Sequence, residues 1–261
     1  MLKIDESLLQ KFQNDGFLLF KGLIPKSITN PILDVAKVHL KYKVPPIETE
    51  YEYIKEDKKE YKESIRRLRQ VYDRDILFKS WMESGIFCEY FKEILNDNPT
   101  LITAHHNSIM TKMPKTSTQT RWHQDIRYWS YESSNLVSVW LALGEESSQN
   151  GVLEFIAGSH KMEFSKEQFD EKLYFREDLE QNQELISNKV SFNLEAGDVI
   201  LFHSLLLHRA NKNITNEPKI SFVYTVKGEK NRAIPNTRSS KFKEIELFDE
   251  LPIDKSRGFW L

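Results

Sequence analysis

Three side chains in this sequence could together hold a redox-active metal. His123 and Asp125 are two positions apart, and alternate residues of a strand point to the same face, so an imidazole and a carboxylate are expected side by side. A long apolar run, Val-Ile-Leu-Phe-His-Ser-Leu-Leu-Leu-His, ends on His208. Two histidines and one carboxylate bind one face of a non-haem Fe(II) and leave positions open for other ligands. The pattern therefore predicts a metal site that O₂ and a second small molecule can reach.

The His-x-Asp triplet alone is weak evidence for a metal. With 7 histidines and 39 acidic residues in 261 positions, about one such triplet is expected by chance, and an ordinary ion pair is its simplest interpretation. His203 competes with His208 as the second histidine, but it lies five residues earlier and would face the other side of a regular strand. The adjacent His105 and His106 cannot both face one metal, so we expect neither to be a ligand.

The elements that must position these side chains are short strands. Apolar runs separated by Gly- and Asn-containing turns follow Pro99, at 101–113, 135–144, 151–157, 189–194, 198–208 and 219–226. Many short strands joined by turns predict a mainly β protein, a sandwich or a barrel, with helices flanking it. A polar, helix-like insertion at 161–188 interrupts the strands and is a candidate lid.

The first hundred residues are expected to support this β region. Periodicity and turn residues predict a helix at 5–14 capped by Asp5 or Ser7, a buried strand at 17–24, a helix at 27–42 with Pro31 in its first turn, and a helix at 80–97. The single cysteine, Cys88, falls in the last helix and is expected in the core. The charged stretch 45–70 is expected to be a solvated loop or helix face.

The composition excludes several classes of protein. Lys and Arg number 37 against 39 Asp and Glu, and this formal net charge of -2 argues against a general nucleic-acid binder. No uncharged apolar run approaches the roughly 18 residues of a membrane span, and the N-terminus lacks the apolar region of a secretory signal. One cysteine cannot form a disulfide within the chain, so we expect a reducing, cytoplasmic location. The oligomeric state stays open.

The order of the motifs resembles the phytanoyl-CoA dioxygenase family. The resemblance rests on Trp-His-Gln-Asp, Asn-Leu-Val-Ser-Val-Trp-Leu-Ala-Leu, Asn-Gly-Val-Leu-Glu-Phe-Ile-Ala-Gly-Ser-His and Ala-Gly-Asp-Val-Ile-Leu-Phe-His, and it covers about 101–226 well. Members of this family are Fe(II)- and 2-oxoglutarate-dependent oxygenases built on a double-stranded β-helix, or jelly roll. The resemblance implies that His123, Asp125 and His208 are the iron ligands and that Asp198 and His160 belong to the scaffold.

The resemblance also implies a division of the chain. A single oxygenase domain over 1–261 would have helical support and substrate-side elements at 1–100 and a jelly-roll core at 101–226. The insertion at 161–188 would be a lid on that core, and 227–261 would be a C-terminal tail.

The co-substrate site is where the chain departs from the family. The family usually places an arginine eleven residues after the distal histidine to hold the far carboxylate of 2-oxoglutarate, and here that residue is Lys219. Lysine can form the ion pair, but as a point charge and not as a bidentate fork. Ser221 shares a strand face with Lys219 and could add a hydroxyl.

Three further residues are tied to the co-substrate by the resemblance. It suggests that Asn107 and Thr111 line the pocket, although simple polar positions on an outer face explain them as well. It also allows Gln124 to touch the co-substrate, although Gln124 has the opposite strand parity from His123.

Candidate substrate contacts follow the metal motif. Trp129 and Arg127 lie at even offsets from His123 and could face the substrate, whereas packing at the barrel mouth and a surface ion pair are their alternatives. Arg232 and Arg238 are cations near the C-terminus that could meet an anionic substrate or simply be solvated.

The predicted function is hydroxylation of an aliphatic C–H in a small polar or anionic molecule, with Fe(II), 2-oxoglutarate and O₂ as cofactors and succinate and CO₂ as products. Halogenating relatives leave the carboxylate ligand position to a small residue, so Asp125 favours hydroxylation. The alternative is a cupin-like metal-binding jelly roll, an isomerase or a binding protein, that does not use 2-oxoglutarate.

Overall fold

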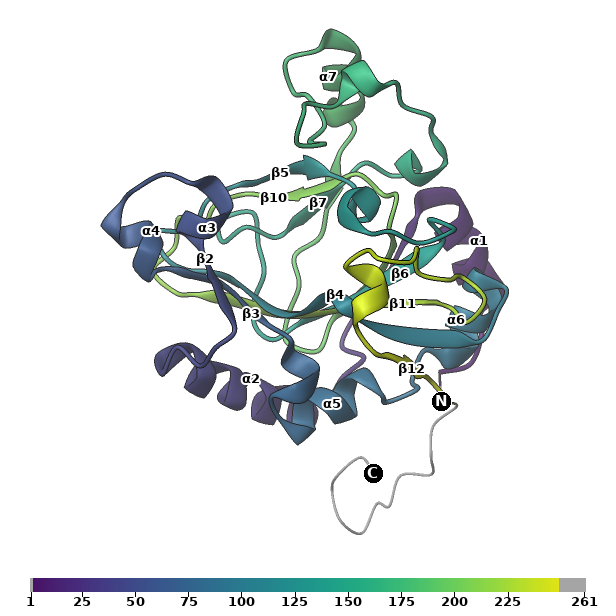
Figure 1. The fold of residues 1–261 in the computed structure, drawn as a ribbon, viewed down its shortest axis with the longest axis horizontal. Helices are drawn as coiled ribbons and strands as arrows, with labels where there is room; N and C mark the ends of the chain where they lie inside the picture. The colour runs from purple at the N-terminus through teal and green to yellow at the C-terminus, as the bar shows by residue number, and fades with distance from the viewer. Residues whose placement is uncertain (1, 249–261) are drawn as a thin grey trace.

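The computed structural model describes residues 2–248, which form two antiparallel sheets with helices around them (Figure 1). The large sheet runs in the order β1 Phe17–Phe20, β9 Val199–His203, β6 Leu136–Ala142, β11 Lys219–Gly228, β4 Pro99–Lys112, β3 Ile65–Arg69 and β2 Ile47–Thr49, and β12 Glu244–Glu246 also pairs with β4. The small sheet runs in the order β5 Thr120–His123, β10 His208–Ala210, β7 Leu153–Phe155 and β8 Val190–Ser191.

Strands from β4 onward pass back and forth between the two sheets. β4, β6, β9 and β11 belong to the large sheet, and β5, β7, β8 and β10 belong to the small one. Apolar side chains between the sheets, such as Phe155 of β7 and Phe202 of β9, pack together with ring centroids 5.7 Å apart. This alternation is the strand order of the expected jelly roll, and it leaves the ends of β5 and β10 facing the large sheet across the interior.

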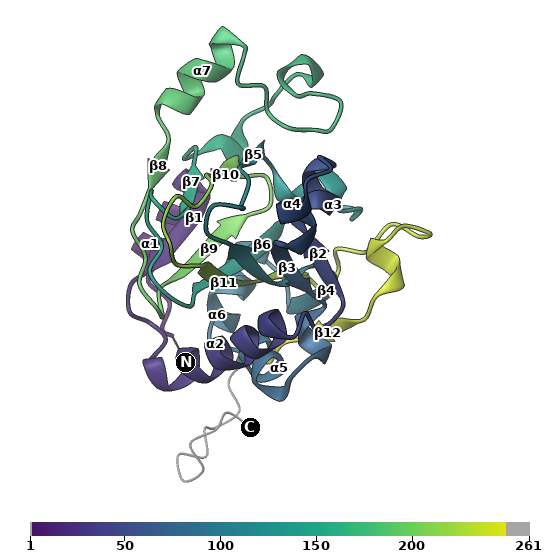
Figure 2. The same ribbon diagram turned by 90° about the vertical axis from the view of Figure 1, so that its left-hand side faces the viewer.

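Helices cover the outer face of the large sheet. Residues 2–248 contain seven α-helices, which are α1 Glu6–Asp15, α2 Lys26–Lys41, α3 Glu50–Ile54, α4 Lys59–Glu63, α5 Ile76–Met82, α6 Cys88–Leu95 and α7 Glu180–Ser187. Figure 2 shows α2 and α5 beneath the sheet and α7 at the opposite end of the molecule. None of the helices in the described part of the chain combines the length and the apolar character needed to cross a bilayer.

Side chains of β11 point alternately toward the helices and into the space between the two sheets. Phe222 and Tyr224 point outward, where Phe222 meets Phe78 of α5 edge-on at 5.5 Å and Tyr224 meets Trp81 at 6.1 Å. Lys219 and Ser221 lie on the opposite face and point between the sheets. The outer face therefore anchors the strand in the apolar core, and the inner face carries the polar side chains.

The N-terminal elements largely follow their predicted positions. Asp5 caps α1 by accepting a hydrogen bond from the backbone N–H of Ser7, and Gly16 ends the helix with a positive φ of 83°. The prediction for Pro31 is wrong, because α2 begins at Lys26 and Pro31 is its sixth residue, in the second turn. The predicted helix at 80–97 is two helices, α5 and α6, separated by a turn at Gly85 whose φ is 65°.

The charged stretch 45–70 is only partly solvated, because α4 has no buried residue whereas Glu50 and most of β3 are buried or half-buried. It contains β2, α3, α4 and β3, and β3 pairs with β4 in the large sheet. Leu68 of β3 is buried in the helix-side core, whereas Arg67 and Arg69 lie on the other face of the strand. Periodicity was masked here because polar side chains occupy the inner face of a strand, where apolar ones are usual.

The apolar run at 198–208 is also not one strand. β9 ends at His203, a turn follows, and β10 begins at His208 in the other sheet. The prediction that His208 ends a long strand is therefore wrong, and the parity comparison between His203 and His208 does not apply. The two histidines are separated by a change of sheet.

Candidate functional site

His123 and His208 are direct neighbours across two strands. His123 ends β5, His208 begins β10, and the two are paired in the antiparallel register of the small sheet. Their ring centroids are 4.2 Å apart, and both residues are buried. Pairing in the ladder, and not proximity in the sequence, is what brings these two imidazoles together.

Asp125 completes the group from a short 3₁₀ turn, η2 Asp125–Tyr128. Its Oδ1 lies 3.8 Å from Nε2 of His123 and 3.6 Å from Nε2 of His208, and the three ligand atoms all lie within 4.8 Å of one another. The expectation that His123 and Asp125 alternate on one strand is wrong in detail, because β5 stops at His123. The turn nevertheless returns Asp125 to the side of His123.

The two imidazoles are held in the tautomer that a metal requires. Nδ1 of His123 lies 2.7 Å from the carbonyl oxygen of Arg121, and Nδ1 of His208 lies 2.9 Å from that of Leu206. Since a carbonyl can only accept, each Nδ1 carries the proton and each Nε2 presents its lone pair. Burial, and next the neighbouring His208, lower the pKa of His123 well below its usual value, which keeps it neutral. This donor set fits a divalent metal.

His106 is a functional neighbour that sequence reasoning missed. Its Nε2 lies 3.2 Å from Oδ1 of Asp125, and the other oxygen of Asp125 accepts a hydrogen bond of 3.0 Å from Ser138. Burial lowers the pKa of His106 to about 4 despite the attraction of Asp125. Together, His106 and Ser138 fix the orientation of the carboxylate.

A bulge in β4 delivers His106 to this position. The pairing of β4 with β11 jumps from Asn107 opposite Tyr224 to Ile102 opposite Thr225, so residues 103–106 loop out of the ladder. His105, from the same bulge, stacks on Trp129 at 5.4 Å and bonds to Ser239. The sequence carries no signal for such a bulge, because it depends on the register of a distant strand.

A small cavity of about 60 Å³ lies between the sheets beside the two histidines. Lys219 lines this cavity, and its Nζ lies 3.1 Å from Oε2 of Glu146, which is fully buried. Ser221 and Trp140 also donate hydrogen bonds to Glu146, of 2.6 and 3.1 Å. The hydroxyl of Ser221 is thus directed to a carboxylate of the protein, and Glu146 is a second residue that sequence reasoning missed.

The remaining predicted co-substrate residues are placed differently from one another. Thr111 lines the inner cavity, but its hydroxyl donates to the carbonyl of Ile65. Asn107 accepts a hydrogen bond from the backbone N–H of Tyr72, and it lines the outer cleft instead. Gln124 turns away from both spaces and donates to the carbonyl of Leu205 at 2.6 Å.

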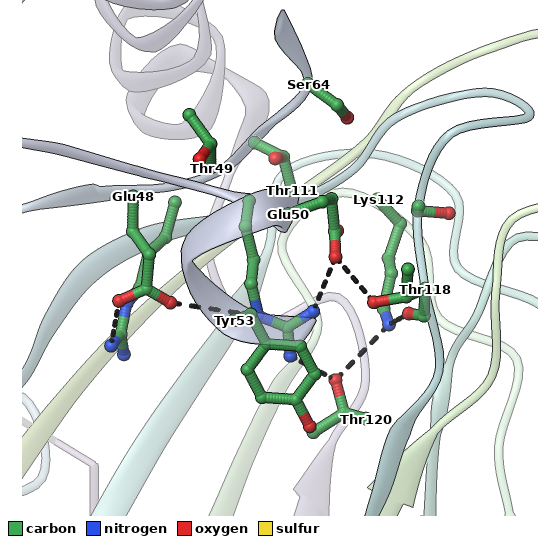
Figure 3. A network of polar contacts seen from close by, with 12 residues as sticks. Glu48, Thr49, Glu50, Tyr53, Ser64, Thr111, Lys112, Thr118 and Thr120 are labelled. Carbon is green, nitrogen blue, oxygen red and sulfur yellow. Dashed lines mark hydrogen bonds and ion pairs between the residues drawn. The ribbon is translucent and has the colours of Figure 1, made fainter. Parts of the chain in front are cut away.

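Two further cations of the inner cavity belong to a polar network shown in Figure 3. Glu50 of α3 is fully buried and accepts hydrogen bonds from Arg66 and Thr118. Lys112 donates to the hydroxyl of Thr120, to which Arg66 also donates. The network fastens the segment around α3 to the barrel and places both Arg66 and Lys112 at the cavity wall.

An outer cleft of about 720 Å³ opens from the triad to solvent. Trp129 and Arg127 both line it, and the guanidinium of Arg127 lies 3.9 Å from the ring centroid of Tyr174. Tyr174 belongs to the insertion at 161–188, and its hydroxyl bonds to that of Tyr53 of α3 at 2.8 Å. The insertion and α3 therefore meet over the cleft.

Comparison with known sequences places these features in one family. A sequence profile described as Phytanoyl-CoA dioxygenase matches residues 12–221. The chain is 26% identical to the peroxisomal phytanoyl-CoA dioxygenase of Homo sapiens over 219 residues, which are 78% of this chain and 62% of that protein. It is 22% identical to a probable phytanoyl-CoA dioxygenase of Caenorhabditis elegans over 221 residues, 78% of this chain and 69% of that protein. The chain thus spans about 62% of the length of its human relative.

Solved structures share the fold. EctD from S. alaskensis, crystallised with 2-oxoglutarate and 5-hydroxyectoine, superposes with a TM-score of 0.75 at 18% identity over 95% of this chain and 87% of that one. The epimerase SnoN, crystallised with Fe3+, alpha ketoglutarate and nogalamycin RO, gives 0.71 at 16% identity over 95% and 96%. The predicted jelly roll with flanking helices is confirmed.

Proposed function

Because this chain belongs to the phytanoyl-CoA dioxygenase family, we propose that it is an Fe(II)- and 2-oxoglutarate-dependent oxygenase. The observation that carries the proposal is the buried group of two imidazoles and one carboxylate, with its ligand atoms within 4.8 Å. That donor set is the one that non-haem Fe(II) oxygenases use. A cupin-like protein that does not use 2-oxoglutarate is not favoured, because EctD and SnoN were both crystallised with this co-substrate.

In this proposal, His123, Asp125 and His208 hold the iron. Bound iron and 2-oxoglutarate would supply the oxidation with O₂, releasing succinate and CO₂. His106 and Ser138 hold Asp125 in place, and the carbonyls behind the two ligand histidines fix their tautomers. The chain's own contribution is thus to orient the ligands before any substrate arrives.

Lys219 is proposed to bind the distal carboxylate of 2-oxoglutarate. It lines the cavity that also contains His123 and His208, and its ammonium is buried. Glu146 already shares that charge, so the grip on a second carboxylate is weaker than that of an unpaired cation. Thr111 and Lys112 are further polar residues of the same cavity.

The substrate is proposed to enter through the outer cleft, where Trp129 and Arg127 would contact it. The insertion at 161–188 is proposed to act as its lid, since Tyr174 reaches across to Tyr53. The proposed reaction is hydroxylation of an aliphatic C–H in a small polar or anionic molecule. Both the reducing compartment and the single-domain organisation stay predictions.

The test uses the anaerobic Fe(II)-loaded protein. 2-Oxoglutarate is expected to produce a visible charge-transfer band in wild type, and Asp125→Ala is expected to lose both iron and the band. The matched control is Asp198→Ala, because Asp198 is an equally buried aspartate that is paired with Lys21, outside the metal group. Unchanged iron content in D125A would show that the ligand assignment is wrong.

A further inference from the structure

The outer cleft is positively charged, although the chain as a whole is slightly negative. Eight arginine and lysine side chains line it against three carboxylates, one of which is Asp125 of the metal group. The chain as a whole has a formal net charge of -2. Cations concentrated in a cleft with low-dielectric walls attract and orient anionic ligands.

Three of these cations stand together on one wall. Arg67 and Arg69 are alternate residues of β3, so they share the strand face that points into the cleft, opposite Met110 and Ser108 of β4. Arg238 comes from the C-terminal segment and is fixed by a hydrogen bond of 3.0 Å from its Nε to the carbonyl of Ala104. Elements from both ends of the chain thus bring three guanidinium groups to one place.

Most of this charge is not neutralised by the protein. Glu48 pairs with Arg67 at 2.6 Å, but within residues 2–248 neither Arg69 nor Arg238 has a carboxylate partner. The Nε groups of Arg67 and Arg69 are buried, and neither has a hydrogen-bond acceptor in the described part of the chain. Partial burial, and next the charges of Arg67 and Arg69, lower the pKa of Arg238. Buried donors without acceptors are costly unless a ligand satisfies them.

We infer that Arg67, Arg69 and Arg238 form a subsite for a phosphate-type oxyanion group of the substrate. Planar guanidinium forks match tetrahedral oxyanions with paired hydrogen bonds, and two of the three have no competing carboxylate. This inference rests on the proposed function, since it assigns the substrate class of the same site. The substrate is then a phosphorylated or similarly charged small molecule, anchored by its anionic end.

The subsite is separate from the place proposed for 2-oxoglutarate. Lys219 lines the inner cavity between the sheets, whereas the three arginines line only the outer cleft. The two spaces share His106 and His123, so they meet at the metal group. A substrate anchored at the arginine wall therefore reaches the triad through the outer cleft and not through the cavity that contains Lys219.

The test compares a charged probe with its neutral counterpart. Phenyl phosphate and phenol are titrated calorimetrically into Mn(II)-loaded protein, and phenyl phosphate is expected to bind wild type at least tenfold more tightly. Arg69→Gln and Arg238→Gln are each expected to weaken phenyl phosphate binding at least tenfold and to leave phenol unaffected. Arg232→Gln is the matched control, because Arg232 is an equally exposed arginine of the same segment that does not line the cleft. Arg238→Lys, which keeps the charge without the fork, is expected to be intermediate.

Three results would contradict the arginine subsite or the proposed function. Equal affinity of wild type for phenyl phosphate and phenol, or full binding of the charged probe by R69Q and R238Q, would overturn the subsite. A parallel loss of 2-oxoglutarate binding in these variants would also overturn it, by assigning the arginines to the co-substrate. Failure of the proposed function itself would appear separately, as absence of 2-oxoglutarate binding to metal-loaded wild type while phenyl phosphate still binds.

Discussion

Lys219 and Glu146 form an ion pair of 3.1 Å that is buried on all sides beside the candidate metal group. The ammonium that we propose to bind the co-substrate carboxylate is therefore already bonded to a carboxylate of the protein. Trp140 and Ser221 complete the hydrogen bonds of Glu146, so the pair is stable without a ligand. Lys219 thus has a role in stability that can be measured separately from its proposed role in binding the co-substrate.

The first prediction concerns that separation. Lys219→Met is expected to weaken 2-oxoglutarate binding at least about tenfold and, by leaving Glu146 unpaired, to cost about 3–5 kcal/mol of unfolding free energy. The double variant K219M/E146Q is expected to regain stability but not co-substrate affinity. Calorimetry and urea denaturation measure the two quantities.

The control for Lys219 lies on the same strand. Lys227 of β11 is equally buried and is paired with Glu244 at 2.9 Å, but it lines neither the cavity nor the cleft. Lys227→Met is expected to lower stability and to leave 2-oxoglutarate binding unchanged. Full affinity in K219M would assign the co-substrate carboxylate to another cation of the cavity, such as Lys112.

The second prediction concerns the network of Figure 3. Glu50→Gln is expected to destabilise the protein by about 1.5–3 kcal/mol, because it removes the nearer carboxylate of buried Arg66, at 3.2 Å, and leaves only Glu48 at 3.9 Å. Glu56→Gln, in the same charged stretch, is expected to cost less than about 0.5 kcal/mol, since the Glu56–Lys58 pair is exposed. Equal losses in urea denaturation would contradict the burial of this segment.

The third prediction concerns the bond between the insertion and α3. Tyr174→Phe and Tyr53→Phe each remove the same hydrogen bond between the two hydroxyls. Each is therefore expected to increase proteolytic cleavage within 161–188 several-fold. The double variant is expected to be no worse than either single one, because only one interaction is lost. Tyr61→Phe on α4 serves as the control, and additive effects in the double variant would contradict the direct bond.

The fourth prediction concerns pH. Burial, and next His160, lower the pKa of His203 to about 4 in the folded protein, and its Nδ1 accepts a hydrogen bond from the N–H of Leu205. The unfolded chain has a pKa of about 6.5 and therefore binds more protons between these values. Stability is thus full above about pH 6.5 and falls as the pH drops toward 4. His203 lines a separate pocket beside α1, and the charged groups that also line this pocket are Glu6, Glu93 and Lys161.

The measurement for His203 is urea denaturation of the metal-free protein at pH 7.5 and 4.5. The unfolding free energy of His203→Gln is expected to fall less between these two pH values than that of wild type. An equal fall in both proteins would show that His203 does not contribute. Other buried histidines, such as His105 with a pKa of about 3, account for the fall in unfolding free energy that remains in His203→Gln.

The sequence predicted the strands of the jelly roll because alternation and turn residues are local signals. It also named the three triad residues and Lys219, since ordered motifs carry them. It could not find His106 or Glu146, because the role of His106 depends on a bulge in β4 and that of Glu146 on an ion pair with Lys219, 73 positions away in the chain. Nothing local distinguishes such a histidine or glutamate from a solvated one.

The prediction that the charged stretch 45–70 is solvated is wrong for Glu50 and β3, for a related reason. Burial of Glu50 depends on Arg66 and on Thr118, a residue 68 positions away in the chain. A run of charges is usually solvated. The cost of burying the Glu50 carboxylate is offset only by hydrogen bonds that exist in the folded protein. The same stretch supplies Arg67 and Arg69 to the cleft, whereas the sequence named only Arg127, Arg232 and Arg238 as cations that could meet the substrate.

The pairing of His123 with His208 has a consequence for how the protein matures. β5 and β10 are separated in the chain by β6 to β9, so their ladder exists only once two distant segments of the chain have paired. A ligand that needs both imidazoles has no site in a partly folded chain, and all of its binding free energy favours the finished state. Metal binding would thus stabilise only the folded protein, and nascent or damaged chains would not bind iron at this site.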